Sequence, residues 1–206
     1  FYQKNQERSA ARNNGIEHSK GRYVCFLDSD DAYLPEHLEV LHSEIEKLSF
    51  PNALFFTHAV ISQNNTLSNP EIIALEDDAI AYLLLNPIIP ARVSIHRSIL
   101  TNIRFREDIV LVEDQVLWTT IAAFFPIYQI AKYTVIYALH DDNSIHIKNN
   151  FSKTRLDGLR KLFNQADMKK TIPKYLQHRL ISDCYFGIAK YYIYIDQDYK
   201  AIPYLI

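Results

Sequence analysis

The chain has 206 residues, of which 48% are hydrophobic and 22% charged, and its formal net charge at pH 7 is −2. This composition excludes an intrinsically disordered chain and gives no electrostatic case for nucleic acid as a partner. Two cysteines make no disulfide framework, and no run of 18 apolar residues predicts a membrane span, so we expect a cytoplasmic protein with at most peripheral association with the inner face of the membrane.

Helix and strand patterns alternate over the first 139 residues. The apolar run at 23–27 is rich in aromatic and β-branched side chains, which predicts a buried strand. Apolar residues recur from Leu34 to Leu48 at spacings of three and four, with Pro35 at the first turn, which predicts a helix. The other elements predicted here are a helix at 7–19, strands at 53–61, 92–96 and 127–139 (interrupted near 131–132), a polar loop at 63–69 and helices at 77–86 and 113–124.

The pattern changes at residue 151, after which no strand signal remains. Leu156, Leu159 and Leu162 mark an amphipathic helix, and a longer helix is predicted at 175–195. We therefore expect a catalytic domain at 1–150 and a helical C-terminal extension at 151–206. A tetratricopeptide-type hairpin is an alternative for the extension, but one copy is not a repeat, which favours a helical cap.

Three carboxylates follow the predicted strand at 23–27 within four positions. They belong to Asp28, Asp30 and Asp31. Ligands bind beyond the carboxyl ends of strands in open α/β sheets, and carboxylates suit a hard cation and the phosphates it carries. The alternative is an Asx turn that caps the next helix, and for Asp31 we favour the cap.

Further motifs surround this acidic turn in a fixed order. The sequence A-R-N-N-G-I at 11–16 precedes it, and Glu113-Asp114 and a late H-x-x-x-S that begins at His140 follow. Over residues 3–146 this order strongly resembles the family 2 glycosyltransferases. The resemblance implies an α/β fold with a GT-A-type, Rossmann-like mixed sheet flanked by helices.

The resemblance also implies a metal and nucleotide-sugar site. Asp30 is the expected direct ligand of Mn²⁺ or Mg²⁺, and Asp28 faces the metal or the ribose. His140 completes the metal or diphosphate site, unless it is an ordinary surface histidine. Arg12 contacts the nucleotide or forms an ion pair with the acidic turn, and the sequence leaves these two interpretations open.

The Glu113-Asp114 pair is where the family resemblance places the general base. An inverting transfer needs a carboxylate that takes the proton of the acceptor hydroxyl. We expect Asp114 to be this base and Glu113 to be its neighbour. The alternative is that both acids only complement the amino end of the helix that follows them.

The predicted function is that of a bacterial, inverting, metal-dependent glycosyltransferase in polysaccharide biosynthesis. It would move a sugar from a nucleotide donor, a UDP-sugar by expectation, to a glycan or lipid-linked glycan. One alternative is a nucleotidyltransferase of related fold, although no G-x-G-x-R-x-x-P-type loop is present. The other is a non-catalytic carbohydrate-binding or scaffold module.

The chain begins with Phe1-Tyr2-Gln3 and without Met, as if a strand were already under way. By the family pattern, we expect an N-terminally truncated fragment that lacks its first strands. Such a fragment would expose an apolar sheet edge through which it self-associates, and it would lack independent transferase activity.

Overall fold

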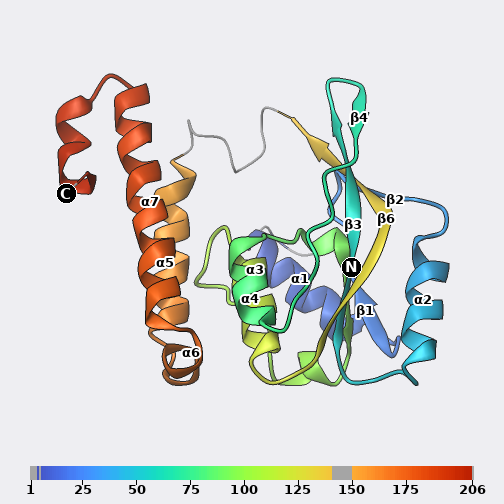
Figure 1. Cartoon of the computed structure of the whole chain (residues 1–206). Helices are drawn as coiled ribbons and strands as arrows, with labels where there is room; N and C mark the ends of the chain where they lie inside the picture. The colour runs from blue at the N-terminus through green and yellow to red at the C-terminus, as the bar shows by residue number, and fades with distance from the viewer. Residues whose placement is uncertain (1–3, 5, 141–149, 206) are drawn as a thin grey trace.

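The structure is a computed structural model that describes residues 4, 6–140 and 150–205. A mixed sheet is flanked by helices, and a helical part lies beside it (Figure 1). The helices are α1 (Glu7–His18), α2 (His37–Lys47), α3 (Ala79–Leu85), α4 (Glu113–Ala122), α5 (Phe151–Phe163), α6 (Ala166–Thr171) and α7 (Lys174–Tyr194). Short 3₁₀ turns lie at Pro90–Arg92, Ile99–Thr101, Asp198–Lys200 and Ile202–Tyr204.

The described strands form one six-stranded sheet with the order β1-β5-β3-β6-β2, and β4 pairs with β3. Only the central pair, β3 with β6, is parallel, and the other pairs are antiparallel. The strands are β1 (Tyr23–Cys25), β2 (Ala32–Tyr33), β3 (Leu54–Gln63), β4 (Thr66–Ser68), β5 (Val93–His96) and β6 (Ile127–Leu139). This arrangement confirms the mixed sheet flanked by helices that the sequence predicts.

Strand β3 is the centre of the fold because both of its faces are buried. Leu54 and Phe56 point into a cluster with α1, α3 and α4, whereas Phe55 points into a second cluster with α2. Successive side chains of a strand point to opposite faces, so a continuous apolar run is what a strand covered on both sides requires. Helices on both faces of the sheet follow from this sequence pattern.

The predicted interruption of the last strand is confirmed as a shift of register. Phe56 lies opposite Gln129, but His58 lies opposite Tyr133, so residues 130–132 of β6 form an irregularity. Strand β6 nevertheless continues to Leu139, and it thereby places His140 beside the acidic turn.

Some local predictions were wrong. The polar loop at 63–69 is a hairpin between β3 and β4, in which Asn64 and Asn65 adopt positive φ angles of 49° and 61°. Asparagine tolerates this left-handed conformation, which two-residue hairpin turns favour. The strand predicted at 23–27 ends at Cys25, and the side chain of Leu27 is 51% exposed.

The helix predicted from Leu34 begins only at His37, and its apolar positions are not equally buried. Leu41 is 3% exposed and packs against the sheet, whereas Leu38 is 60% and Leu48 45% exposed. Leu38 lies beside strand β1, which in the described part of the chain pairs with β5 alone. Self-association through this edge strand stays a prediction.

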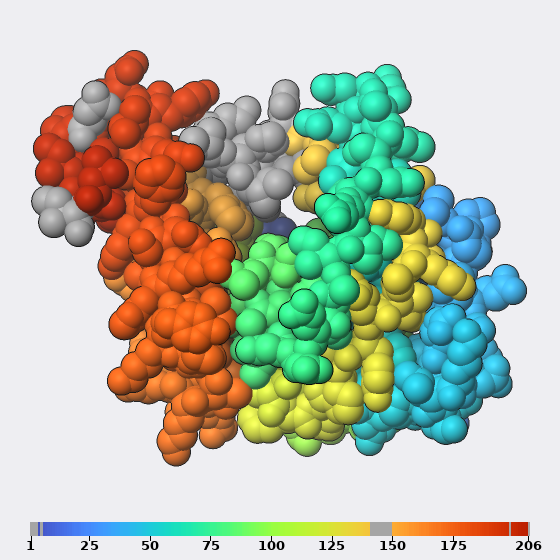
Figure 2. All heavy atoms as spheres, viewed as in Figure 1, coloured from blue at the N-terminus to red at the C-terminus, as the bar shows by residue number. Residues whose placement is uncertain are grey.

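The helical part does not have a core of its own. Leu84 of α3, Ile109 from the segment before α4, and Val116 of α4 belong to the same buried cluster as the apolar faces of α5, α6 and α7. Figure 2 shows these helices, in orange, against the green segment that holds α3. This shared cluster joins the predicted extension to the helices that cover the sheet.

A stability prediction follows from the contact between α5 and α7. A Cβ atom added at Gly187 would lie 2.8 Å from the Cβ of Ser152, whereas one added at Gly15 in α1 meets nothing within 4 Å. We expect Gly187→Ala to lower the free energy of unfolding by about 1–3 kcal/mol, because the helices must move apart. Gly15→Ala, the control, should raise it by about 0.5–1 kcal/mol, because alanine restricts the unfolded chain. Urea unfolding measures both, and a stabilising Gly187→Ala would contradict the packing.

Candidate active site

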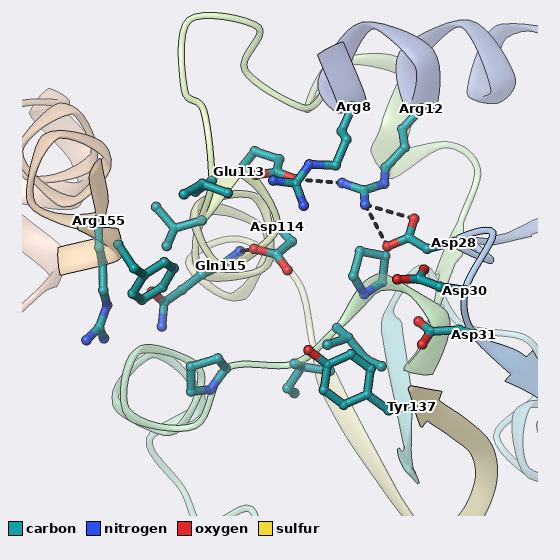
Figure 3. Close-up of a pocket in the computed structure, with 17 residues that line it drawn as sticks. Arg8, Arg12, Asp28, Asp30, Asp31, Glu113, Asp114, Gln115, Tyr137 and Arg155 are labelled. Carbon is teal, nitrogen blue, oxygen red and sulfur yellow. Dashed lines mark hydrogen bonds and ion pairs between the residues drawn. The ribbon is translucent and has the colours of Figure 1, made fainter. Parts of the chain in front are cut away.

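A pocket of about 220 Å³ opens where the acidic turn faces the start of α4. Asp28, Asp30 and Asp31 line one end, and Asp114 lies between this end and Arg155 of α5 (Figure 3). The structure therefore brings together the carboxylates that the sequence analysis selected from two distant segments.

Arg12 of α1 ties these two segments to each other. Its Nη2 atom donates to both carboxylate oxygens of Asp28 at 2.9 Å, and its Nη1 atom donates to Oε1 of Glu113 at 2.7 Å. The side chains of Arg12 and Glu113 are only 10% and 5% exposed. Of the two interpretations left open for Arg12, the ion pair with the acidic turn is confirmed, through Asp28.

Asp30 and His140 form the outer part of the acidic end. Nε2 of His140 lies 3.1 Å from Oδ2 of Asp30, and both side chains are almost half exposed. The late histidine is therefore placed at the acidic turn by the end of β6. The residues that follow it in the motif, at 141–149, lie outside the described residues.

Asp31 does not cap the next helix, so that prediction was wrong. Its Oδ1 accepts a hydrogen bond of 3.3 Å from the backbone N–H of Ala138 in β6, and α2 begins without a side-chain cap. Burial raises the pKa of Asp31 to about 6, and the negative charges of Asp30 and Asp28 add to this rise. Asp31 thus fastens the turn to β6.

The donor atoms at this end fit a divalent cation that also binds a ligand. Among the described residues, no three His, Cys, Asp or Glu side chains converge into a complete cation site. Mg²⁺ is commonly held by one or two carboxylates together with phosphates and waters, and Mn²⁺ accepts the same oxygen ligands. Asp30 and His140 offer such a partial set, because Arg12 already engages both oxygens of Asp28.

The Glu113-Asp114 pair begins α4 directly after a strained segment. Leu111 and Val112 have positive φ angles of 61° and 55°, which are costly for residues other than glycine. The αL backbone at these positions turns the chain so that Glu113 meets Arg12 while Asp114 lines the pocket. The structure therefore separates the environments of the two neighbouring acids.

Asp114 has a strongly perturbed ionisation. Burial and, next, the negative charge of Glu113 raise its pKa, although its Oδ1 accepts a hydrogen bond of 2.7 Å from the N–H of Gln115. Carboxylates with raised pKa values that line a pocket are typical of groups that transfer protons.

Several residues that the sequence analysis did not select complete this site. The Nε2 atom of Gln115 donates to the carbonyls of Leu83 and Leu84 at 3.1 and 2.9 Å, which fixes the first turn of α4 to α3. A Cβ atom at Gly158 would lie only 2.5 Å from a methyl carbon of Val112, so α5 presses on the strained segment. No motif marks Gln115 or Gly158, because their roles depend on contacts between helices.

Comparison with known proteins agrees with the site and the fold. Residues 2–100 match the model of glycosyl transferase family 2. An uncharacterized glycosyltransferase of Rickettsia bellii is 25% identical over 179 residues, which cover 84% of this chain and 25% of that protein. A putative teichuronic acid biosynthesis glycosyltransferase, TuaG, of Bacillus subtilis is 30% identical over 117 residues, which cover 53% and 45%.

Solved structures of S. aureus TarS, residues 1–349, share the fold at 15% identity. The TM-score is 0.54 for one structure and 0.57 for its complex with UDP-GlcNAc, with 89% of this chain and 50% and 53% of those chains covered. This chain spans less than half the length of the curated relatives named above. Residues 2–100 therefore match glycosyl transferase family 2, and the chain shares the GT-A fold of the TarS structures.

Proposed function

We propose that this chain carries the site of an inverting, metal-dependent glycosyltransferase that moves a sugar from a UDP-sugar to the hydroxyl of a glycan or lipid-linked glycan. The observation that carries the proposal is a single pocket that joins the acidic turn to Asp114, a carboxylate with a raised pKa. A nucleotide sugar needs a site for its diphosphate and a base for its acceptor, and the acidic turn and Asp114 are suited to these two tasks.

The acidic end is suited to the donor diphosphate. Asp30 and His140 would hold Mn²⁺ or Mg²⁺, with Asp28 beside them, oriented by Arg12. A divalent cation bound there supplies charge neutralisation for the departing diphosphate. The complex of TarS with UDP-GlcNAc supports UDP as the nucleotide.

Asp114 is suited to the acceptor. A carboxylate that faces the donor across a pocket can remove the proton of an attacking hydroxyl, and attack from the opposite face inverts the sugar carbon. Of the two neighbouring acids, Glu113 is held in its ion pair with Arg12, whereas Asp114 forms no ion pair with an arginine among the described residues.

The acceptor proposal is supported by what one relative is named for. TuaG is named for teichuronic acid biosynthesis, which supports a polysaccharide or its lipid-linked precursor as the acceptor. Within the described part of the chain, no helix has the length and apolar character needed to cross a bilayer. We propose peripheral association with the inner face of the membrane for reaching a lipid-linked acceptor.

The metal assignment predicts the effect of Asp30→Ala in the complete protein. Mn²⁺-dependent binding of UDP should weaken at least tenfold, because one ligand of the cation is lost. Asp183→Ala, which removes an exposed carboxylate from α7, should leave binding unchanged. Isothermal titration with UDP, with and without Mn²⁺, measures both variants. Equal binding by Asp30→Ala and the wild type would contradict the assignment.

The base assignment predicts the effect of Asp114→Asn. This change keeps the shape of the side chain and removes the proton acceptor, so kcat should fall roughly 10²–10⁴-fold. The affinity for UDP with Mn²⁺ should stay within about twofold, because Asp114 lies away from the acidic end. Turnover close to that of the wild type would move the role to another group.

The pH dependence gives an independent check. A base works only when it is deprotonated, and burial together with Glu113 raises the pKa of Asp114 to about 7. The specificity constant kcat/KM should therefore be low at acidic pH, rise as the pH passes through about 7 and level off above it. A plateau that already begins near pH 5 would contradict the role of Asp114.

A further inference from the structure

Arg155 lines the pocket, and no carboxylate among the described residues forms an ion pair with it. It comes from α5, is half-buried, and makes no hydrogen bond or ion pair with any residue that the structure describes. The other two arginines of the pocket differ, since Arg12 pairs with Glu113 at 2.7 Å and Arg8 lies 3.8 Å from the same carboxylate. A partly buried charge is costly unless it is paired. An anionic ligand that binds the guanidinium of Arg155 would supply the opposite charge.

Charge is distributed unevenly along the pocket. Figure 3 shows Asp28, Asp30 and Asp31 on one side of Asp114 and Arg155 on the other. A bare anionic group is repelled by the three carboxylates and attracted by the guanidinium of Arg155. An anion on a ligand is therefore directed to the α5 end, whereas a diphosphate at the acidic end needs a cation.

The surroundings of Arg155 fit a small carbon skeleton that carries the anion. Phe151 precedes Arg155 by four positions on α5, so the two side chains share one face of the helix. Leu111 and Val112 supply further apolar lining on the side of α4. Apolar walls with a few convergent polar groups are typical of small-ligand sites, and a guanidinium can donate two parallel hydrogen bonds to a carboxylate or phosphate.

We infer that the Arg155 end of the pocket binds an anionic group of the acceptor, a carboxylate or a phosphate, while the reacting hydroxyl lies at Asp114. The inference rests on the proposed function and adds the class of acceptor to it: a sugar or polyol with a negative charge close to the hydroxyl that reacts. Arg155 would then set specificity from a helix outside the residues that match the family model.

The test uses paired probes that differ only in charge, with the complete protein saturated with UDP and Mn²⁺. Methyl β-glucuronide against methyl β-glucoside tests a carboxylate, and glycerol 1-phosphate against glycerol tests a phosphate. Saturation-transfer NMR titrations give the affinity of each probe. We expect one anionic probe to bind at least about tenfold more tightly than its neutral counterpart, in the range of a charge-assisted hydrogen bond.

The variants assign this preference to one side chain. Arg155→Gln should abolish it, and Arg155→Lys should retain part of it because the charge is kept. Arg160→Gln is the matched control, since it removes an exposed arginine from the same helix, one that donates to the hydroxyl of Tyr185. UDP binding with Mn²⁺ should stay within about twofold in all three variants, because the acidic end is unchanged.

The outcomes separate the two proposals. Equal binding of charged and neutral probes, or a preference that survives in Arg155→Gln, overturns the inference and leaves the proposed function standing. If Arg155→Gln weakens the binding of UDP as much as it weakens the binding of the anionic probe, the inference is also overturned, because Arg155 would then serve the donor. A wild-type protein that fails to bind UDP with Mn²⁺ overturns the proposed function, and the inference falls with it.

Discussion

Arg12 donates hydrogen bonds to Asp28 and to Glu113, which lie 16 and 101 positions away in the chain, and this bridge holds the site together. It joins α1, the turn after β1 and the first turn of α4, three segments with no backbone pairing to one another. The ion pair between Arg12 and Glu113 is nearly inaccessible to water. Removing either of these two side chains would therefore leave the other as a buried, unpaired charge, at a cost of several kcal/mol. The acidic turn and the first turn of α4 keep their spacing because this guanidinium binds both.

The bridge also gives neighbouring carboxylates different chemical properties. Glu113 is neutralised by Arg12, whereas Asp114 lies in the pocket beside that negative charge and has a raised pKa. The strained backbone at Leu111 and Val112 points the two side chains in different directions, and the close contact at Gly158 holds that strain in place. Strain of this kind persists only where the surrounding packing enforces it.

The helical part takes part in the site through this packing. It shares a buried cluster with α3 and α4, and it contributes Phe151 and Arg155 to the pocket lining. Variation in these helices would change the Arg155 end of the pocket without touching the acidic turn.

Local patterns in the sequence determined most of the helices and strands and the acidic turn: the continuous apolar run of β3, the helical spacing of Leu41 and Ile45, and the three carboxylates just beyond β1. The fold class and the choice of Glu113 and Asp114 came from the resemblance of the ordered motifs to family 2 glycosyltransferases. Strands β2 and β4 and helix α6 were not predicted. Asp31 was misread because its partner, the backbone of Ala138, lies 107 positions away. Tertiary structure alone decided the bridge of Arg12, the different surroundings of Glu113 and Asp114, and the position of Arg155 in the pocket lining. Each depends on contacts between segments far apart in the chain, which local spacing does not encode.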